Sequence, residues 1–459
     1  MTLDVSRRAF LQRASALSLA GAASPFVMNL AAIGEAAAST ATDYKALVCV
    51  FLYGGNDYAN TLIPADAASY ALYNAQRPGL SYTQAQIAGT ILNSSVALAG
   101  GRQYAVAPEL ASLVPIFNAG KMAVMLNVGT LVQPTTKAQY QAGNVPLPPR
   151  LLSHNDQQNY WQASSPEGAS SGWGGRIGDL LQSGNGDATL TCINPSGNAV
   201  FLTGKSAVQY SVTTSGPIAL NARNSLQGSA AAGTLLQSLI SNPVNHQFET
   251  VLASQGNRAL KLYNTVSTAL AAAPVTTTPF PAAADPGSSL GAQLQQVAKL
   301  ISVSSQLGAK RQVFFVSSGN FDTHDGLVTV HPKLMQNLAD ALNAFYKTTV
   351  ELGVSNQVTT FTASDFGRAL TANNDGTDHG WGSMHFVLGG AVNGGRYYGT
   401  PPAVGNGTND DIGQGRLIPT MSVDQYGATL ASWFGVAASD LPTVLPNIGN
   451  YTTKNIGFV

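Results

Sequence analysis

Acidic and imidazole side chains recur at four places in this chain, each beside an apolar run. The stretch GGNDYAN contributes Asp57 and Asn60, and FDTHD contributes Asp322 and His324. Two later stretches, SDFGR and DHGWGSMH, contribute the rest of the set: Asp365, Arg368, Asp378, His379 and His385. Carboxylates and neutral imidazoles suit Zn, Mn or Mg, and grouped carboxylates repel one another unless a cation or a proton intervenes. The pattern therefore favours a divalent metal site over a bare acid–base pair.

Single members of this set also have ordinary structural interpretations. Asp57 could cap the helix that follows it, and Asp365 could simply pair with Arg368. His385, at the start of a strand, could be a core histidine with satisfied hydrogen bonds. The recurrence at four strand ends favours the metal site, because side chains beyond the carboxyl ends of parallel strands meet at one edge of a sheet.

A second polar group opens an expected helix in PPRLLSHNDQQNYWQ, where Ser153 stands at the first position. A hydroxyl at a helix N-terminus lies in the positive end of the helix dipole and is a candidate nucleophile. The alternative is an N-cap, with Asp156 in the capping-box position. The two roles do not exclude one another.

The elements that position these residues alternate between strands and helices. Runs of apolar, β-branched and aromatic residues predict buried strands within 45–57, 121–129, 311–325, 357–368 and 385–392. Helical patterns precede two of them, at 107–120 and 334–353. This alternation predicts an α/β fold of three layers, α/β/α, around a mainly parallel sheet. We expect one domain over residues 43–459, with an insertion or lid at 185–292 that contains an Ala/Pro/Thr/Ser-rich stretch.

Composition excludes several classes of protein. Lys and Arg number 23, Asp and Glu number 23, and no basic patch is present, so the sequence does not predict nucleic-acid binding. Only Cys49 and Cys192 occur; a disulfide between them stays open, although Cys49 in an apolar run favours a buried thiol. No mature segment has the roughly 18 apolar residues that a membrane span requires.

The first 38 residues are typical of a twin-arginine signal peptide. SRRAFLQ carries Arg7 and Arg8, a weakly apolar stretch follows, and small residues end the segment. The alternative is an amphipathic first helix of the mature protein. The signal predicts export by the twin-arginine translocase to the periplasm or the cell exterior.

Together these motifs resemble the DUF1501 family of exported bacterial proteins of unknown function. The resemblance spans nearly the whole mature chain and is carried by GGNDYANTLIP, LLSHNDQQNYWQ, GWGGRIGD, FDTHD, SDFGR, DHGWGSMHFVLGGAVNGGRYYG and GRLIPTMSVDQYGATLASWFG. That family is similar in turn to the alkaline phosphatase and sulfatase superfamily of metal-dependent hydrolases. This likeness implies an alkaline-phosphatase-like core with one or two metal ions, Ser153 as the hydroxyl nucleophile, and ligands among Asp57, Asp322, His324, Asp365 and either His379 or His385.

Two departures from the superfamily pattern bear on the expected chemistry. Phe366 follows Asp365 where the superfamily usually has a ligating histidine, so one metal site could be lost. The sulfatase cysteine motif is absent, which argues against that sulfatase route. We expect an exported hydrolase of small phosphate or sulfate esters, with Arg368 or Asn60 steadying charge on the transferred group. The alternatives are a non-catalytic envelope or surface protein that binds a glycan, and a metal kept for stability alone.

Overall fold

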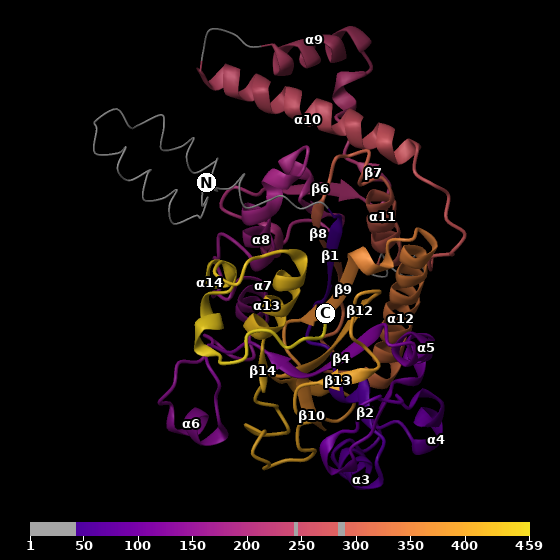
Figure 1. The fold of residues 1–459 in the computed structure, drawn as a ribbon, viewed down its shortest axis with the longest axis vertical. Helices are drawn as coiled ribbons and strands as arrows, with labels where there is room; N and C mark the ends of the chain where they lie inside the picture. The colour runs from indigo at the N-terminus through magenta and orange to yellow at the C-terminus, as the bar shows by residue number, and fades with distance from the viewer. Residues whose placement is uncertain (1–42, 243–246, 283–289) are drawn as a thin grey trace, which may run out of the picture.

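The computed structural model describes residues 43–242, 247–282 and 290–459 (Figure 1). The expected signal peptide at 1–38 lies outside these residues. The central sheet has ten strands in the order β13-β4-β12-β9-β1-β8-β5-β6-β7, and β14 pairs with β4. Their bounds are β1 Lys45–Leu52, β4 Met122–Gly129, β5 Cys192–Asn194, β6 Gln209–Thr213, β7 Gly216–Pro217, β8 Arg311–Ser318, β9 Val358–Ser364, β12 Ser383–Gly389, β13 Arg396–Tyr398 and β14 Met421–Ser422.

The sheet is mainly parallel, as the alternation of strands and helices predicts. Strand β1 pairs in parallel with both β8 and β9 at the centre. One predicted strand runs the other way, since β12 is antiparallel to both β9 and β4. The start of β12 therefore lies at the same sheet edge as the carboxyl ends of β1, β8 and β9. This direction allows residues that precede β12 to join residues that follow the other strands.

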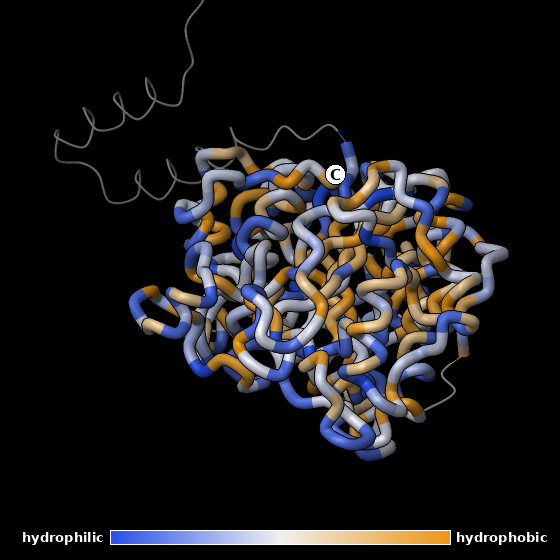
Figure 2. Tube along the Cα trace, turned by 90° about the horizontal axis from the view of Figure 1, so that it is seen from below, coloured by the Kyte–Doolittle hydropathy of each residue, from blue (hydrophilic) through white to orange (hydrophobic). Residues whose placement is uncertain are grey.

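Helices cover both faces of the sheet, which confirms the three-layer α/β/α prediction. Along β1, the residues Ala46, Val48 and Val50 belong to one apolar cluster, and Leu47 and Cys49 belong to the other, as the two-residue period of a strand requires. The first face is covered by α5 Val114–Asn118, α11 Leu290–Ser302 and α12 Leu327–Glu351. The second is covered by α7 His154–Ala163, α8 Trp173–Leu181, α13 Val423–Phe434 and α14 Leu441–Val444. Figure 2 shows hydrophobic segments mainly towards the inside of the molecule and hydrophilic segments mainly towards its outside.

Smaller elements complete the body. Two short ribbons pair β2 Leu62–Pro64 with β3 Tyr104–Val106 and β10 Arg368–Ala372 with β11 Thr377–His379. The remaining α-helices in the described part of the body are α3 Ala67–Gln76, α4 Gln84–Ile87 and α6 Lys137–Ala142, and short 3-10 helices connect several of the elements. In the expected insertion at 185–292, β5 to β7 extend the central sheet. The helices α9 Ala230–Ser241 and α10 Gln247–Ala271 form a pair at one end of the molecule (Figure 1).

Two further expectations concern thiols and membrane spans. Cys49 and Cys192 are both buried and free, so the structure contains no disulfide between them. Burial raises the pKa of the Cys49 thiol well above its usual range. Across the part of the chain that the structure describes, every helix is too short or too polar to span a bilayer.

Candidate metal centre

Three side chains from distant parts of the sequence converge at the sheet edge where β8 ends and β12 begins. His154 is the first residue of α7, Asp322 lies in the loop after β8, and His379 ends β11. One potential ligand atom from each lies within 4.8 Å of the others. The sheet supplies this meeting point because the loop after β8 and the β10–β11 ribbon leave it on the same edge.

The imidazole nitrogens and carboxylate oxygens of this cluster lie within about hydrogen-bonding distance of one another. The Asp322 Oδ1 atom lies 3.2 Å from His379 Nε2 and 3.2 Å from His324 Nε2. Asp322 Oδ2 lies 3.3 Å from His154 Nε2, and the two Nε2 atoms of His324 and His379 are 2.9 Å apart. Three imidazole nitrogens therefore face one carboxylate.

The tautomer of His379 follows from its other ring nitrogen. His379 Nδ1 lies 2.7 Å from the carbonyl oxygen of Leu152, and because a carbonyl only accepts, Nδ1 carries the hydrogen. The neutral ring then presents the Nε2 lone pair to the Asp322 carboxylate. Burial lowers the pKa of His379, which favours this neutral form. Two acceptors thus point at one another, an arrangement that a cation between them would satisfy.

His154 is oriented in the same way by a carboxylate. Its Nδ1 lies 2.7 Å from Asp365 Oδ2, so Nδ1 donates, and its Nε2 is buried without a hydrogen-bond partner among the described residues. Asp365 is itself fixed by Gly54 N at 3.1 Å and Gln158 Nε2 at 2.8 Å. The hydrogen bond with Asp365 raises the pKa of His154. A proton on His154 Nε2 would give the ring a positive charge beside the negative Asp322 carboxylate. A metal ion bound between the two groups would take the place of that proton.

These observations fit a metal with a two-histidine, one-carboxylate ligand set. Metal-ligating histidines commonly donate their second N–H to a carboxylate or a backbone carbonyl, and the partners here are Asp365 and the Leu152 carbonyl. His154, His379 and Asp322 would hold the ion, with His324 Nε2 as a further ligand within reach. Leu152 adopts φ 72°, a backbone strain that aims its carbonyl at His379.

Arg368 and Phe366 support the cluster from the interior. Arg368 is fully buried; it donates to Asp322 Oδ1 at 2.7 Å, to the Gly54 carbonyl at 3.1 Å, and to Thr377. Burial alone would raise the pKa of Asp322, but Arg368 holds it below the usual value. The ring of Phe366 lies 4.9 Å from His154 and 4.8 Å from His379, measured between ring centroids. Phe366 therefore packs against the side of the His154 and His379 rings that faces the interior of the protein.

The structure brings together part of the candidate set from the sequence. Asp322, His324, Asp365 and His379 lie in the cluster, and Arg368 contacts it through Asp322. Asp378 lies at its rim, 3.7 Å from His324. The alternative pairing of Asp365 with Arg368 does not form, because the Asp365 carboxylate bonds His154 and the Arg368 guanidinium bonds Asp322.

Three candidates lie in other surroundings. Asp57 is buried against Arg77 in an ion pair and accepts from the backbone of Ala59 and Asn60, so the capping interpretation describes it. Asn60 bonds Tyr73 and the Leu80 carbonyl.

His385 lies inside the sheet, 3.3 Å from Thr362 Oγ1 and packed against Trp161 and Tyr426. Burial lowers its pKa to about 3. His385 thus has the burial of a core histidine but only part of the expected hydrogen bonding, because its Nε2 has no hydrogen-bond partner among the described residues.

Ser153 occupies the N-cap position of α7 but makes no capping hydrogen bond with its side chain. Its hydroxyl instead donates to Asp156 Oδ2 at 2.9 Å. The neighbours on either side, Leu152 and His154, both contact the cluster. Ser153 therefore lies next to the centre in the chain with its hydroxyl directed at a carboxylate.

Sequence reasoning missed His154, Arg77 and the Leu152 carbonyl. His154 stands in the SHND stretch, where a role was assigned to Ser153 and none to the adjacent histidine. Arg77 ends an ordinary surface helix, and a backbone carbonyl has no sequence signature. Only His154 carried a signal that could have been found.

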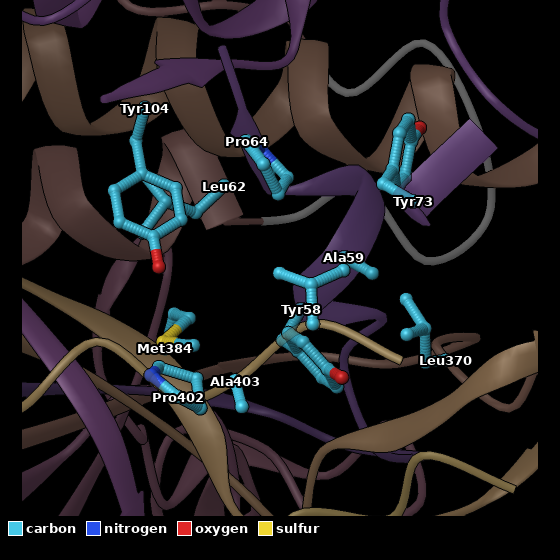
Figure 3. Close-up of a pocket in the computed structure, with 11 residues that line it drawn as sticks. Tyr58, Ala59, Leu62, Pro64, Tyr73, Tyr104, Leu370, Met384, Pro402 and Ala403 are labelled. Carbon is cyan, nitrogen blue, oxygen red and sulfur yellow. The ribbon is translucent and has the colours of Figure 1, made fainter. Parts of the chain in front are cut away.

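A separate small cavity lies among Tyr58, Leu62, Tyr104, Leu370 and Met384 (Figure 3). Its volume is about 20 Å³, enough for roughly one water molecule, and none of the cluster's imidazoles lines it. The cavity is therefore separate from the candidate metal centre.

Comparison with known proteins gives one family and several distant likenesses. A family model described as "Protein of unknown function (DUF1501)" matches residues 44–425. A search of curated proteins finds no match to the chain. Among solved structures, the lipoteichoic acid synthase LtaP from Listeria monocytogenes is similar at 8% identity and TM-score 0.33, covering 88% of this chain and 74% of that one.

Two sulfatase structures give similar values. A 2-O GAG sulfatase, BT1596, matches at 11% identity and TM-score 0.29, over 88% of this chain and 75% of its own. A putative sulfatase from Bacteroides thetaiotaomicron VPI-5482 matches at 10% identity and TM-score 0.28, with the same coverage. At such values these likenesses do not bear on activity.

Proposed function

We propose that this chain, which belongs to the DUF1501 family, is a metal-dependent hydrolase of phosphate or sulfate esters. The observation that carries the proposal is that the Nε2 atoms of His154 and His379 both approach the Asp322 carboxylate. The Nδ1 hydrogen bonds of the two rings, to Asp365 and to the Leu152 carbonyl, fix which ring nitrogen carries the hydrogen. A divalent ion held there would supply Lewis-acid polarisation of an ester oxygen.

The charges around the cluster support an anionic substrate. The cluster and its rim contain three carboxylates, Asp322, Asp365 and Asp378, and two guanidinium groups, Arg368 and Arg416. This leaves one negative charge, which a divalent cation would convert into one positive charge. A negatively charged ester would then be attracted, and it would be repelled without the ion.

The chain's own residues would divide the remaining work. Asp365 and the Leu152 carbonyl hold the imidazoles in one orientation, and Phe366 excludes water from their inner side. Ser153 remains the candidate nucleophile, since Asp156 at 2.9 Å could accept its proton. The exposed side chains of Asp322 and His324, at 43% and 41%, leave the outer side open to substrate.

The test is the metal content of protein purified without chelator, followed by an ester assay. Wild-type protein should hold near-stoichiometric divalent metal, and His154→Ala or His379→Ala should weaken metal affinity by at least about tenfold, since even outer partners of metal ligands have effects of that size. His385→Leu is the matched control, because it removes a histidine outside the cluster and should leave metal content unchanged. Metal-dependent release of p-nitrophenol from its phosphate or sulfate ester would then support hydrolysis.

A folded wild type that takes up no divalent ion, and whose melting temperature no such ion changes, would exclude the proposal. Metal uptake that His154→Ala and His379→Ala leave intact would place the ion elsewhere.

A further inference from the structure

We propose that Arg416 is the residue that recognises the tetrahedral oxyanion of the substrate at this centre. The inference rests on the proposed function and names the substrate class and the group that binds it: a phosphate or sulfate ester held by a guanidinium fork. Arg416 is outside the set of candidate residues drawn from the sequence, because it stands in a Gly-rich loop, NGTNDDIGQGR, that resembles an ordinary turn.

Arg416 is attached to the cluster at one end only. Its Nε donates to the carbonyl oxygen of His379 at 2.7 Å, which holds the guanidinium beside the candidate metal ligands. Its Nη2 lies 3.6 Å from Asp378 Oδ2, a distance for charge attraction and too long for a hydrogen bond. Neither Nη atom makes a hydrogen bond within the described residues, and the side chain is 22% exposed. The fork therefore keeps unused donors at the open rim.

The loop that carries Arg416 is fixed in place by a buried carboxylate. Asp411 accepts from Gly407 N at 2.7 Å and Gly413 N at 2.6 Å, and it bridges to Leu417. The Leu417 carbonyl in turn accepts from Gly382 N at 2.8 Å, which ties the loop to the turn before β12. The position of the guanidinium is thus set before any ligand arrives, so binding costs little ordering of the loop.

None of the other described arginines near the centre combines a fixed guanidinium with unused donors at the open rim. The guanidinium of Arg368 donates hydrogen bonds to Thr377, Gly54 and Asp322, and that of Arg77 forms an ion pair with Asp57. Arg150 is 76% exposed and reaches only Asp156, at 3.8 Å. Among the described arginines that contact the cluster, Arg416 alone combines a fixed position with unused donors, so it replaces Arg368 as our candidate for steadying the transferred group.

The chemistry of the fork selects the ligand. Two guanidinium N–H groups match two oxygens of a tetrahedral oxyanion. Phe366 closes the inner side of the imidazoles, so a ligand must enter from the rim that Arg416, Asp378 and His324 share. Asp378 repels an anion there, which makes binding dependent on the metal charge as well as on Arg416.

The experiment measures binding of inorganic phosphate and, separately, of inorganic sulfate to metal-loaded protein by calorimetry. Wild type is compared with Arg416→Gln, Arg416→Lys and the control Arg396→Gln, which removes a half-buried arginine on β13 that bonds Tyr398 and not the cluster. Arg416→Gln should weaken oxyanion binding by about 10- to 100-fold, the size expected for hydrogen bonds to charged groups, with metal content unchanged. Arg416→Lys should recover only part of the loss, and Arg396→Gln should match wild type.

If an ester is hydrolysed, Arg416→Gln should raise KM more than it lowers kcat, because it removes ground-state binding. Equal oxyanion affinity in wild type and Arg416→Gln, both fully loaded with metal, would overturn the inference, as would wild type that holds metal and binds neither ion. Oxyanion binding that depends on Arg416 in a protein with no esterase activity would uphold the inference and count against the hydrolase proposal. The tighter ion of the two identifies the ester class.

Discussion

At the scale of single residues, two aspartates that each follow a buried strand end in different chemical situations. Asp365 accepts from His154 and lies within the cluster, whereas Asp57 is closed off by Arg77. Burial alone would raise the pKa of Asp57, but the Arg77 guanidinium outweighs it and holds the pKa below its usual value. A carboxylate with a permanent internal cation has no need of a metal ion.

Replacing Arg77 with Met should therefore lower the free energy of unfolding and leave the metal content unchanged. The change leaves the Asp57 carboxylate buried without its counter-ion, which costs about 3–5 kcal/mol of unfolding free energy. Urea denaturation measures the cost, and metal analysis of the same folded sample should give wild-type content. The double variant Asp57→Asn/Arg77→Met should recover part of the stability, because the uncompensated charge is gone. Loss of metal from a stable Arg77→Met protein would show that Asp57 belongs to the centre after all.

At the scale of elements, the centre depends on turns that pack against one another beyond the strand ends. The turn after β1 places Gly54 at φ 115°, where an added Cβ would lie 2.4 Å from the backbone nitrogen of Asp322. Gly55, at φ 80°, leaves room for the ring of Phe366 in the same way. The first strand thus contributes no ligand to the candidate metal set and yet sets where Asp322 and Phe366 stand.

Gly54→Ala should displace the loop that carries Asp322 and so weaken metal binding together with stability. Gly79→Ala is its matched control: Gly79 also has a positive φ, 77°, but an added Cβ meets nothing within 4 Å. The control should lose only the backbone term of about 1–2 kcal/mol and keep its metal affinity. Gly54→Ala should lose more than this and bind metal at least about tenfold more weakly, by analogy with displaced outer partners of metal ligands. Equal effects of the two substitutions would contradict the packing argument.

At the scale of the whole molecule, two buried histidines outside the cluster couple folding to pH. Burial lowers the pKa of His331 to about 4 and that of His385 to about 3, both from an ordinary value of 6.5. Below pH 6.5 the unfolded chain takes up these protons and the folded chain does not, so stability falls as the pH drops toward the folded pKa values. Asp424 acts in the opposite sense, because burial raises its pKa to about 6 and the folded state then binds the extra proton.

Comparing wild type with His385→Leu separates one of these contributions. The wild type should lose stability faster than the variant between pH 6.5 and pH 4, by an amount that grows by about 1.4 kcal/mol per pH unit once the unfolded histidine is mostly protonated. Urea unfolding at a series of pH values gives both curves, and Asp424 and the cluster histidines cancel in the difference. Parallel curves for the two proteins would mean that His385 takes up its proton over the same pH range in the folded and unfolded states, and so would contradict the lowered pKa.

The sequence by itself determined the layers of the fold and most of the candidate ligands. The apolar run 45–52 and the β-branched, partly apolar run 358–364 both form strands that are buried on both faces, and successive residues of β1 pack into the two opposite cores. The polar residues after β8 and β9, Asp322, His324 and Asp365, follow from the same pattern, since chain direction places loops at the strand ends. His379 lies with them for a reason that the sequence pattern does not contain. Because β12 is antiparallel to β9, the segment that leads into β12 lies at the same sheet edge as the carboxyl ends of the parallel strands.

Only the tertiary structure decided which partner each polar group receives. Hydrogen bonds such as His154 to Asp365, separated by 211 residues, and His379 to the Leu152 carbonyl, separated by 227 residues, depend on loop paths that no local periodicity encodes. The same holds for Arg77, whose packing against Asp57 removes that carboxylate from the candidate ligand set, and for Arg416, whose loop is held by Asp411. Residue type limits what a side chain can do, and the contacts formed on folding select its tautomer, its charge and its neighbours.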